Sequence, residues 1–353
     1  MSESNFLTLF DIIIGIYTIV IFQFLVIVYT FGKSMYQYRI LSKEKNWEEK
    51  IDDEIFLYIF NERDSDNPII NDELKSNNFK DFFIKKILHA LISFSGNSKE
   101  RVINLYYLYH LDKYSVQKLN SKNHYKIAEA LQEVTAIGIE DTLPNIENLL
   151  FHPNELVRDE AQYAVLKFKG IEGLSFFSNY NYNITVWQQI KLLNVTEAIP
   201  IESNQLFYDW LQSKNESVVI FTLKLITKFQ LFEFEEYLLK MLNNCSTTIK
   251  TQIIKTFASI NSFYTVDQLI EYYPYQEIEI QIEILKIIDR ISEPHHQNFL
   301  IAEAINHSNL SIKKKAVKAL INLTNIEETI QLLETSSKDD NQSILNQIIL
   351  ENK

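Results

Sequence analysis

Residues 142–170, TLPNIENLLFHPNELVRDEAQYAVLKFKG, decide the fold. Pro144 stands near the start of a predicted first helix, where the missing N–H of proline costs nothing. After a turn at 152–154, a predicted second helix carries its apolar and small residues on one stripe, and Gly170 ends it. The members of that stripe are Leu156, Val157, Ala161, Ala164, Val165 and Phe168. The stretch therefore predicts two packed helices joined by a turn.

The same pattern recurs along most of the chain. Apolar or small residues follow each equivalent of Val157 at four and seven positions. The equivalents predicted from the sequence are Ile127, Val186, Val218, Ile249, Ile278 and Ile312, which by subtraction are 30, 29, 32, 31, 29 and 34 residues apart. A repeat of this length made of two helices is typical of an α-solenoid. We therefore predict an all-α fold, with an N-terminal transmembrane helix followed by a solenoid of about eight helix pairs.

Composition agrees with this prediction. The 353 residues include only six Gly and six Pro, where average usage would give roughly 25 and 18. Such a chain lacks the turn residues of a β-sandwich and the glycines of a phosphate-binding loop. One stretch, Glu277–Ile284 (EIEIQIEI), alternates like a strand. The repeat period instead places Ile278, Ile282 and Leu285 on one helical face, so we predict a helix there.

The N-terminal segment 6–31 predicts a membrane-spanning helix. After Asp11, about 20 residues carry no charge, enough to cross a ~30 Å hydrocarbon layer. Representative residues of this segment are Ile12, Ile16, Phe22, Leu25 and Tyr29. The basic flank that follows consists of Lys33, Arg39, Lys43 and Lys45. Because cytoplasmic flanks hold the excess of Lys and Arg, we expect the N-terminus outside and the repeats in the cytoplasm.

The sequence therefore predicts four segments. Residues 1–5 form a short external N-terminus, and residues 6–31 form the transmembrane helix. Residues 32–78 form a juxtamembrane helix and a polar linker, and residues 79–353 form the repeat solenoid.

The stretch 142–170 resembles a HEAT repeat, with its early proline and HPNELVRDEAQYAV across the turn. The resemblance covers roughly residues 80–351 and implies stacked helix pairs. HEAT families typically carry Arg or Lys directly after the Val157 position, and Arg158, Lys250 and Lys313 fit that pattern. Trp187, Val219 and Glu279 occupy the same predicted position in other copies and depart from it.

No sequence motif indicates catalysis. The chain contains no HExxH, GxGxxG, GxxxxGK[ST] or GxSxG pattern, and its single cysteine is Cys245. Glu293, His295 and His296 form a compact trio, but adjacent histidines on a helix point to different faces, so we expect a solvated turn. We expect no catalytic residue, metal or cofactor. The net charge of −12 disfavours nucleic-acid binding, which would need a local basic face.

The remaining candidate site is the concave face, which the second helices of a solenoid line. Its candidate partner-binding residues are Arg158, Trp187, Lys250, Lys313 and Lys314. The first hypothesis is a scaffold that binds a protein partner at a bacterial inner membrane, with membrane glycosyltransferases among the machinery it would serve. The alternative is a ligand-binding protein or lyase-type enzyme with a small-molecule pocket, because some HEAT-like proteins resemble bilin lyases. The oligomeric state stays open.

Overall fold

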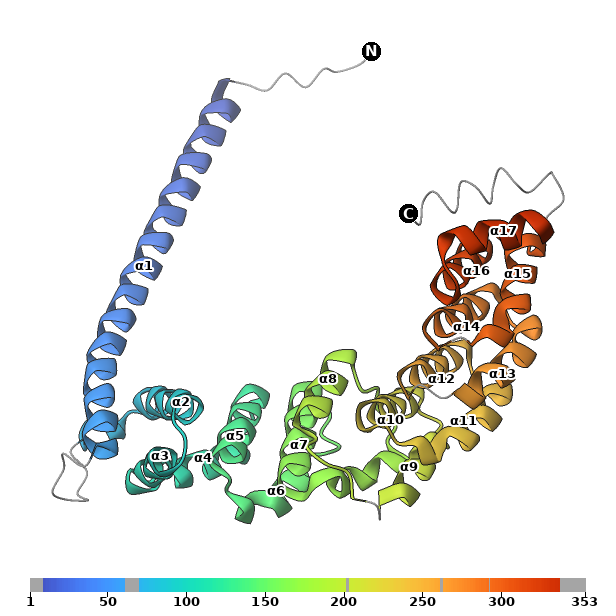
Figure 1. Ribbon diagram of the computed structural model, residues 1–353. Coiled ribbons are helices and arrows are strands. Elements are labelled where there is room, and N and C mark those ends of the chain that lie inside the picture. The colour runs from blue at the N-terminus through green and yellow to red at the C-terminus, as the bar shows by residue number, and fades with distance from the viewer. Residues whose placement is uncertain (1–8, 61–69, 201–202, 261–262, 292, 337–353) are drawn as a thin grey trace. The chain divides into compact units, whose positions relative to one another are not determined.

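The computed structural model describes residues 9–60, 70–200, 203–260, 263–291 and 293–336 (Figure 1). Within these ranges all regular structure is helical, which confirms the predicted fold class. Glu277–Ile284 contains no strand, because all but its first residue lie in α14 (Ile278–Ile291). The helical period therefore outweighs the local alternation there.

After the first helix, the helices follow one another in pairs. The eight pairs in the described residues are α2 (Asn77–Ser93) with α3 (Asn97–Leu108), α4 (Leu111–Leu119) with α5 (His124–Ile137), α6 (Leu143–Glu147) with α7 (Glu155–Lys169), the 3₁₀ segment η3 (Gly170–Asn179) with α8 (Val186–Val195), α9 (Asn204–Leu211) with α10 (Glu216–Phe229), α11 (Glu235–Met241) with α12 (Thr247–Ile260), α13 (Phe263–Tyr272) with α14, and α15 (Gln297–Asn306) with α16 (Leu310–Leu323). Helix α17 (Ile326–Ser336) follows them. The sequence predicts that residues 326–351 form the terminal helix pair, and residues 337–353 lie outside the described residues.

Short 3₁₀ turns lie beside the first helices of several pairs. They are η1 (Glu73–Lys75), η2 (Glu140–Thr142), η5 (Phe232–Phe234), η6 (Leu242–Asn244), η7 (Tyr273–Tyr275) and η8 (Pro294–His296). The chain divides into two compact units, residues 1–161 and 162–353, with the division inside α7. Each unit has its own buried apolar core.

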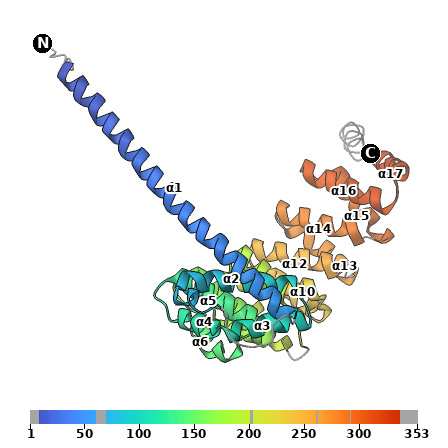
Figure 2. The ribbon, with the colours of Figure 1, turned by 90° about the vertical axis from the view of Figure 1, so that its left-hand side faces the viewer.

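Helix α1 is continuous from Leu9 to Ile59, as Figures 1 and 2 show. The sequence predicts a transmembrane helix at 6–31 and a separate juxtamembrane helix within 32–78, but no break divides them. Ile51, Ile55 and Ile59 are buried in the core of the first unit, and Trp47 packs edge-on against Phe79 at 5.4 Å between ring centroids. The C-terminal turns of α1 therefore belong to the first of the two compact units. Residues 1–8 and 61–69 lie outside the described residues.

The second helices define the repeat register, and two predicted positions need correction. Val157, Val218, Ile249 and Ile312 are each the third residue of their helix and are at most 7% exposed. Val186 and Ile278 instead begin their helices and are 65% and 43% exposed. The third residues of α8 and α14 are Gln188 and Ile280, each 1% exposed. We call these buried positions the reference residues: Ile127, the fourth residue of α5, and the third residues Val157, Gln188, Val218, Ile249, Ile280 and Ile312 of the helices that follow. By subtraction they are 30, 31, 30, 31, 31 and 32 residues apart.

The polar reference residue Gln188 has its own hydrogen-bonded surroundings. Its Nε2 donates to Oε1 of Gln162 at 3.2 Å, and Nε2 of Gln162 donates to the hydroxyl of Tyr180 at 2.6 Å. All three side chains are buried. Because buried amides need such partners, the network lets a glutamine occupy a core position.

Gly173 allows η3 to lie against α7. A Cβ at this position would stand 2.7 Å from Cγ1 and 2.8 Å from the carbonyl oxygen of Val165. Glycine is therefore the only residue that fits without displacing the neighbouring turn.

Candidate functional site

Arg158 and Lys313, two predicted partner-binding residues, are buried and bind the backbone of their own repeats. They are 7% and 8% exposed. Nη1 of Arg158 donates to the carbonyl oxygens of His152 and Pro153, both at 2.8 Å. Nζ of Lys313 donates to the carbonyl oxygen of Ile305 at 2.9 Å. Both cations therefore satisfy carbonyl groups at the end of the preceding first helix or turn, where helices leave acceptors unpaired.

In the corrected register, glutamines of other repeats donate hydrogen bonds to backbone carbonyl groups, as Arg158 and Lys313 do. Gln189 and Gln281 directly follow the reference residues of α8 and α14. Gln189 Nε2 donates to the carbonyl oxygen of Ile184 at 3.0 Å, and Gln281 Nε2 donates to that of Tyr273 at 3.2 Å. The departures that the sequence shows at Trp187 and Glu279 therefore come from the misplaced register. Ala128 and Val219, which directly follow Ile127 and Val218, still break the series of polar donors.

The remaining predicted cations are half-buried. Lys250 Nζ donates to Oε1 of Gln276 at 3.4 Å and lies 5.9 Å from the ring centroid of Tyr272. Lys314 lies next to Lys313 on α16 and is also half-buried. Neither presents an isolated charge to solvent.

Trp187 differs from the other candidates because it is 76% exposed. It lines an open groove of about 360 Å³ in the second unit. The groove is formed by Tyr163, Trp187, Ile190, Lys191, Asn194 and Val195. Ile190 is 42% exposed, and Nζ of Lys191 lies 4.6 Å from the ring centroid of Tyr163. An apolar floor with a cation at one side is thus open to solvent on α8.

Four lysines that the sequence analysis does not single out share one register position. Each stands six residues after the reference residue of its helix, and we name the set the lysine row: Lys224, Lys255, Lys286 and Lys318. Their helices α10, α12, α14 and α16 contact one another in sequence and lie side by side in both views (Figures 1 and 2). The equivalent residue of α8 is Asn194, which lines the Trp187 groove.

The interactions of the lysine row are made with residues of its own helices and of neighbouring helices. Burial lowers the pKa of Lys224, and the positive charge of Lys255 lowers it further. Nζ of Lys224 donates to Oε1 of Gln189 on α8 at 2.8 Å. Lys255 and Lys286 are exposed, and Lys286 pairs with Glu283 at 2.7 Å. Lys318, also exposed, lies 3.5 Å from Asp289 on α14.

Charge is segregated between first and second helices in this part of the second unit. Helices α10, α12, α14 and α16 together carry ten Lys and Arg residues against four Asp and Glu residues. Their partners α9, α11, α13 and α15 carry six acidic residues and one lysine. An acidic chain therefore contains a local basic layer on its second helices.

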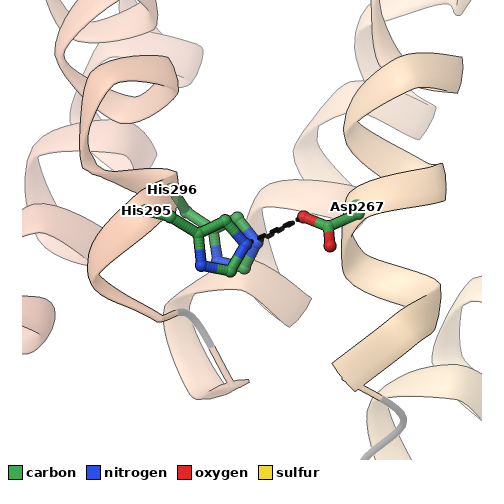
Figure 3. Close-up of side chains that lie close together, drawn as sticks. All are labelled: Asp267, His295 and His296. Carbon is green, nitrogen blue, oxygen red and sulfur yellow. Dashed lines mark hydrogen bonds and ion pairs between the residues drawn. The ribbon is translucent and has the colours of Figure 1, made fainter.

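Asp267 on α13 brings His295 and His296 together, as Figure 3 shows. Nε2 of His295 and Nε2 of His296 lie 3.0 and 2.9 Å from the same oxygen, Oδ1 of Asp267. These hydrogen bonds hold the pKa of Asp267 below its usual range. The expectation that adjacent histidines diverge is wrong here, because the pair lies in a 3₁₀ turn with ring centroids 3.9 Å apart.

The two hydrogen bonds of the His296 ring show that its contact with Asp267 is structural. Its Nδ1 accepts the backbone N–H of Glu293 at 2.9 Å, so the neutral ring carries its proton on Nε2 and donates it to Asp267. A metal ion would need the lone pair of that same nitrogen. The trio thus closes a capping box at η8 and ties it to α13.

His152 and His307 hold the same position in their repeats, just before the turn, and this shared position in the sequence predicts a role in turn formation and helix capping. Nδ1 of His152 accepts the N–H of Asn154 at 3.1 Å, and Nδ1 of His307 accepts that of Asn309 at 3.0 Å. Asn309 in turn caps α16 by accepting from Ser311 at 2.8 Å. The capping interpretation is confirmed.

Among the residues that the structure describes, one helix is long and apolar enough to cross a membrane. The segment Ile13–Met35 has a mean hydropathy of 2.3, and no residue in its most apolar stretch is buried. Ile16, Phe22, Leu25 and Tyr29 are all more than half exposed. The segment contains one exposed lysine near its C-terminal end, Lys33, and two more exposed lysines follow it, Lys43 and Lys45. The side chains of Ile12 and Arg39 lie outside the described residues.

Comparison with known proteins gives no family assignment. No family model and no curated protein matches the chain. Among solved structures, importin beta aligns at 12% identity and a TM-score of 0.40, over 86% of this chain and 49% of importin beta. An engineered protein aligns at 13% identity and 0.35, over 79% and 89% of the two chains. The complex of CpcE and CpcF of phycocyanin lyase from Nostoc aligns at 11% identity and 0.26, over 77% and 97%.

Proposed function

We propose that this chain is a membrane-tethered scaffold whose helical repeats bind a protein partner. The observation that carries the proposal is the groove around Trp187. A tryptophan that is 76% exposed beside Ile190 is costly to leave in water. Large aromatic side chains also supply much of the binding energy at protein interfaces. The partner would insert an apolar side chain against Trp187 and place an acidic group near Lys191.

The tether is the exposed apolar segment Ile13–Met35. The lysines that follow it support an orientation with the repeats in the cytoplasm. Because α1 is continuous into the core of the first unit, the tether would hold that unit close to the membrane surface. This arrangement suits an accessory subunit of inner-membrane machinery in a bacterium, such as a membrane glycosyltransferase.

Site-specific crosslinking in native membranes tests the proposal. A photoreactive amino acid replaces Trp187 in the full-length chain, and the matched control replaces Tyr275, which is 85% exposed but lies outside the groove. We expect one protein to crosslink from position 187 and not from position 275. Trp187→Ala should reduce recovery of that protein from solubilised membranes by about tenfold or more. If position 187 yields no protein adduct, or Tyr275→Ala lowers recovery equally, the proposal fails.

A further inference from the structure

The lysine row continues the surface that begins at the Trp187 groove. Asn194 of α8 holds the same register position as Lys224, Lys255, Lys286 and Lys318. Helix α8 contacts α10, and Lys224 bonds to Gln189 across that contact. A chain that leaves the groove can therefore cross α10, α12, α14 and α16 in turn.

We infer that the lysine row binds an acidic, extended segment of the partner protein, whose carboxylates pair with successive lysines. This inference rests on the proposed function, because it names the chemistry of the partner. Charge complementarity carries it: α10, α12, α14 and α16 together hold ten basic and four acidic residues in a chain whose net charge is −12. A basic layer in so acidic a chain attracts and orients an acidic partner.

Helix geometry sets the spacing of the partner's acidic residues. Packed helices lie about 8–10 Å apart, so one lysine per helix repeats at that distance. A polyproline II segment advances about 3.1 Å per residue and turns once every three residues. Every third side chain therefore faces the same way and lies about 9 Å from the next. An acidic residue at every third position would meet each lysine in register.

Two acidic residues beside the lysine row favour the binding of a protein segment over the binding of a nucleic acid. Glu283 and Asp289 lie beside Lys286 and Lys318 at 2.7 and 3.5 Å. They are partly buried, with side-chain exposures of 18% and 16%. These carboxylates would repel the closely spaced charges of a phosphate backbone. Separate carboxylates on a peptide can pair with the lysines and avoid them.

A binding assay with the detergent-solubilised full chain tests the inference. The probe is a fluorescein-labelled (Glu-Pro-Pro)₅ peptide, with (Gln-Pro-Pro)₅ as the neutral control and a peptide of the same composition with its five Glu contiguous as the spacing control. We expect fluorescence anisotropy to report salt-sensitive binding of the spaced acidic peptide, and weaker binding of both controls. Equal binding of the contiguous or the neutral peptide overturns the inference, as does tighter binding of single-stranded DNA.

Variants locate the binding surface. Replacing all four lysines of the row with Gln should weaken binding of the acidic peptide by about tenfold. The matched control changes four exposed lysines elsewhere, Lys99, Lys122, Lys214 and Lys240, and so alters net charge equally. Equal weakening by both sets overturns the inference. If the row variant still crosslinks its partner from position 187 and binds the peptide unchanged, the inference fails while the proposed function stands; if no partner crosslinks, the proposed function fails.

Discussion

The ammonium group of Lys118 and the carboxylate of Glu133 form an ion pair in the interior of the first unit, where the two side chains are 5% and 2% exposed. Asp81 and Glu129 approach the same ammonium group at 3.0 and 3.3 Å. Ser115 donates to the second oxygen of Glu133. The three carboxylates thus surround a lysine of the protein itself, and this network joins α2, α4 and α5.

Removing the lysine should be strongly destabilising. Lys118→Met leaves Glu133 buried without its counter-charge, so we expect the free energy of unfolding to fall by about 3–5 kcal/mol. Urea unfolding of the full chain, followed by circular dichroism, measures this change. Lys99→Met, at an exposed position, should stay within about 0.5 kcal/mol of the wild type. Similar midpoints for the two variants would contradict the prediction.

The same pair predicts a loss of stability in alkali. Burial alone would lower the pKa of Lys118, but the charge and hydrogen bonds of its carboxylate partners raise the pKa above its ordinary value of 10.5. A raised lysine pKa stabilises the fold fully below pH 10.5, and that stability is lost as pH rises through the folded-state pKa. Urea midpoints measured from pH 8 to 11.5 should fall at the alkaline end in the wild type. Lys118→Met should lack that component of the fall.

Two neighbouring isoleucines of α14 test the corrected register. Ile280→Ala removes a side chain that is 1% exposed, so it should cost about 2–5 kcal/mol of stability. Ile278→Ala removes one that is 43% exposed and should change stability by about 0.5 kcal/mol or less. Urea unfolding of both variants measures and compares these two losses of stability. A larger loss for Ile278→Ala would restore the register predicted from the sequence.

Gly173→Ala should destabilise the contact between η3 and α7. The added Cβ would overlap Val165, and such overpacking typically costs about 1–3 kcal/mol. Gly32→Ala is the control, because its Cβ would meet no atom within 4 Å. Thermal unfolding should show a lower midpoint for Gly173→Ala alone. An unchanged midpoint would mean that the two segments separate easily.

Arg158 and Trp187 should separate stability from binding. Arg158→Ala leaves two carbonyl oxygens without their donor, so we expect a loss of about 1–3 kcal/mol in stability. Crosslinking from position 187 should persist in that variant under conditions where it is folded. Trp187→Ala should have the opposite profile, with normal unfolding and lost partner recovery. Unfolding curves and crosslinking yields, measured side by side, test both expectations.

The sequence by itself determined the helical fold, the repeat and the apolar N-terminal segment, because each depends on the local order of apolar and polar residues. EIEIQIEI shows this clearly, since the period of the repeat correctly outweighs its strand-like alternation. The register of two repeats was not accessible in the same way. Val186 and Ile278 are apolar but exposed, while the buried residue of α8 is Gln188, whose burial depends on Gln162 and Tyr180.

Tertiary structure alone decided which charged residues face solvent. Arg158 and Lys313 match the expected pattern of basic residues, yet they bind carbonyl groups of their own repeats. Lys224 and Lys255 are 31 residues apart in the chain, by subtraction, and become neighbours only when α10 packs against α12. Hydrophobic periodicity identifies the buried stripe of each helix. The alignment of polar residues from one helix to the next depends on the stacking of the helices, which no single stretch of sequence contains.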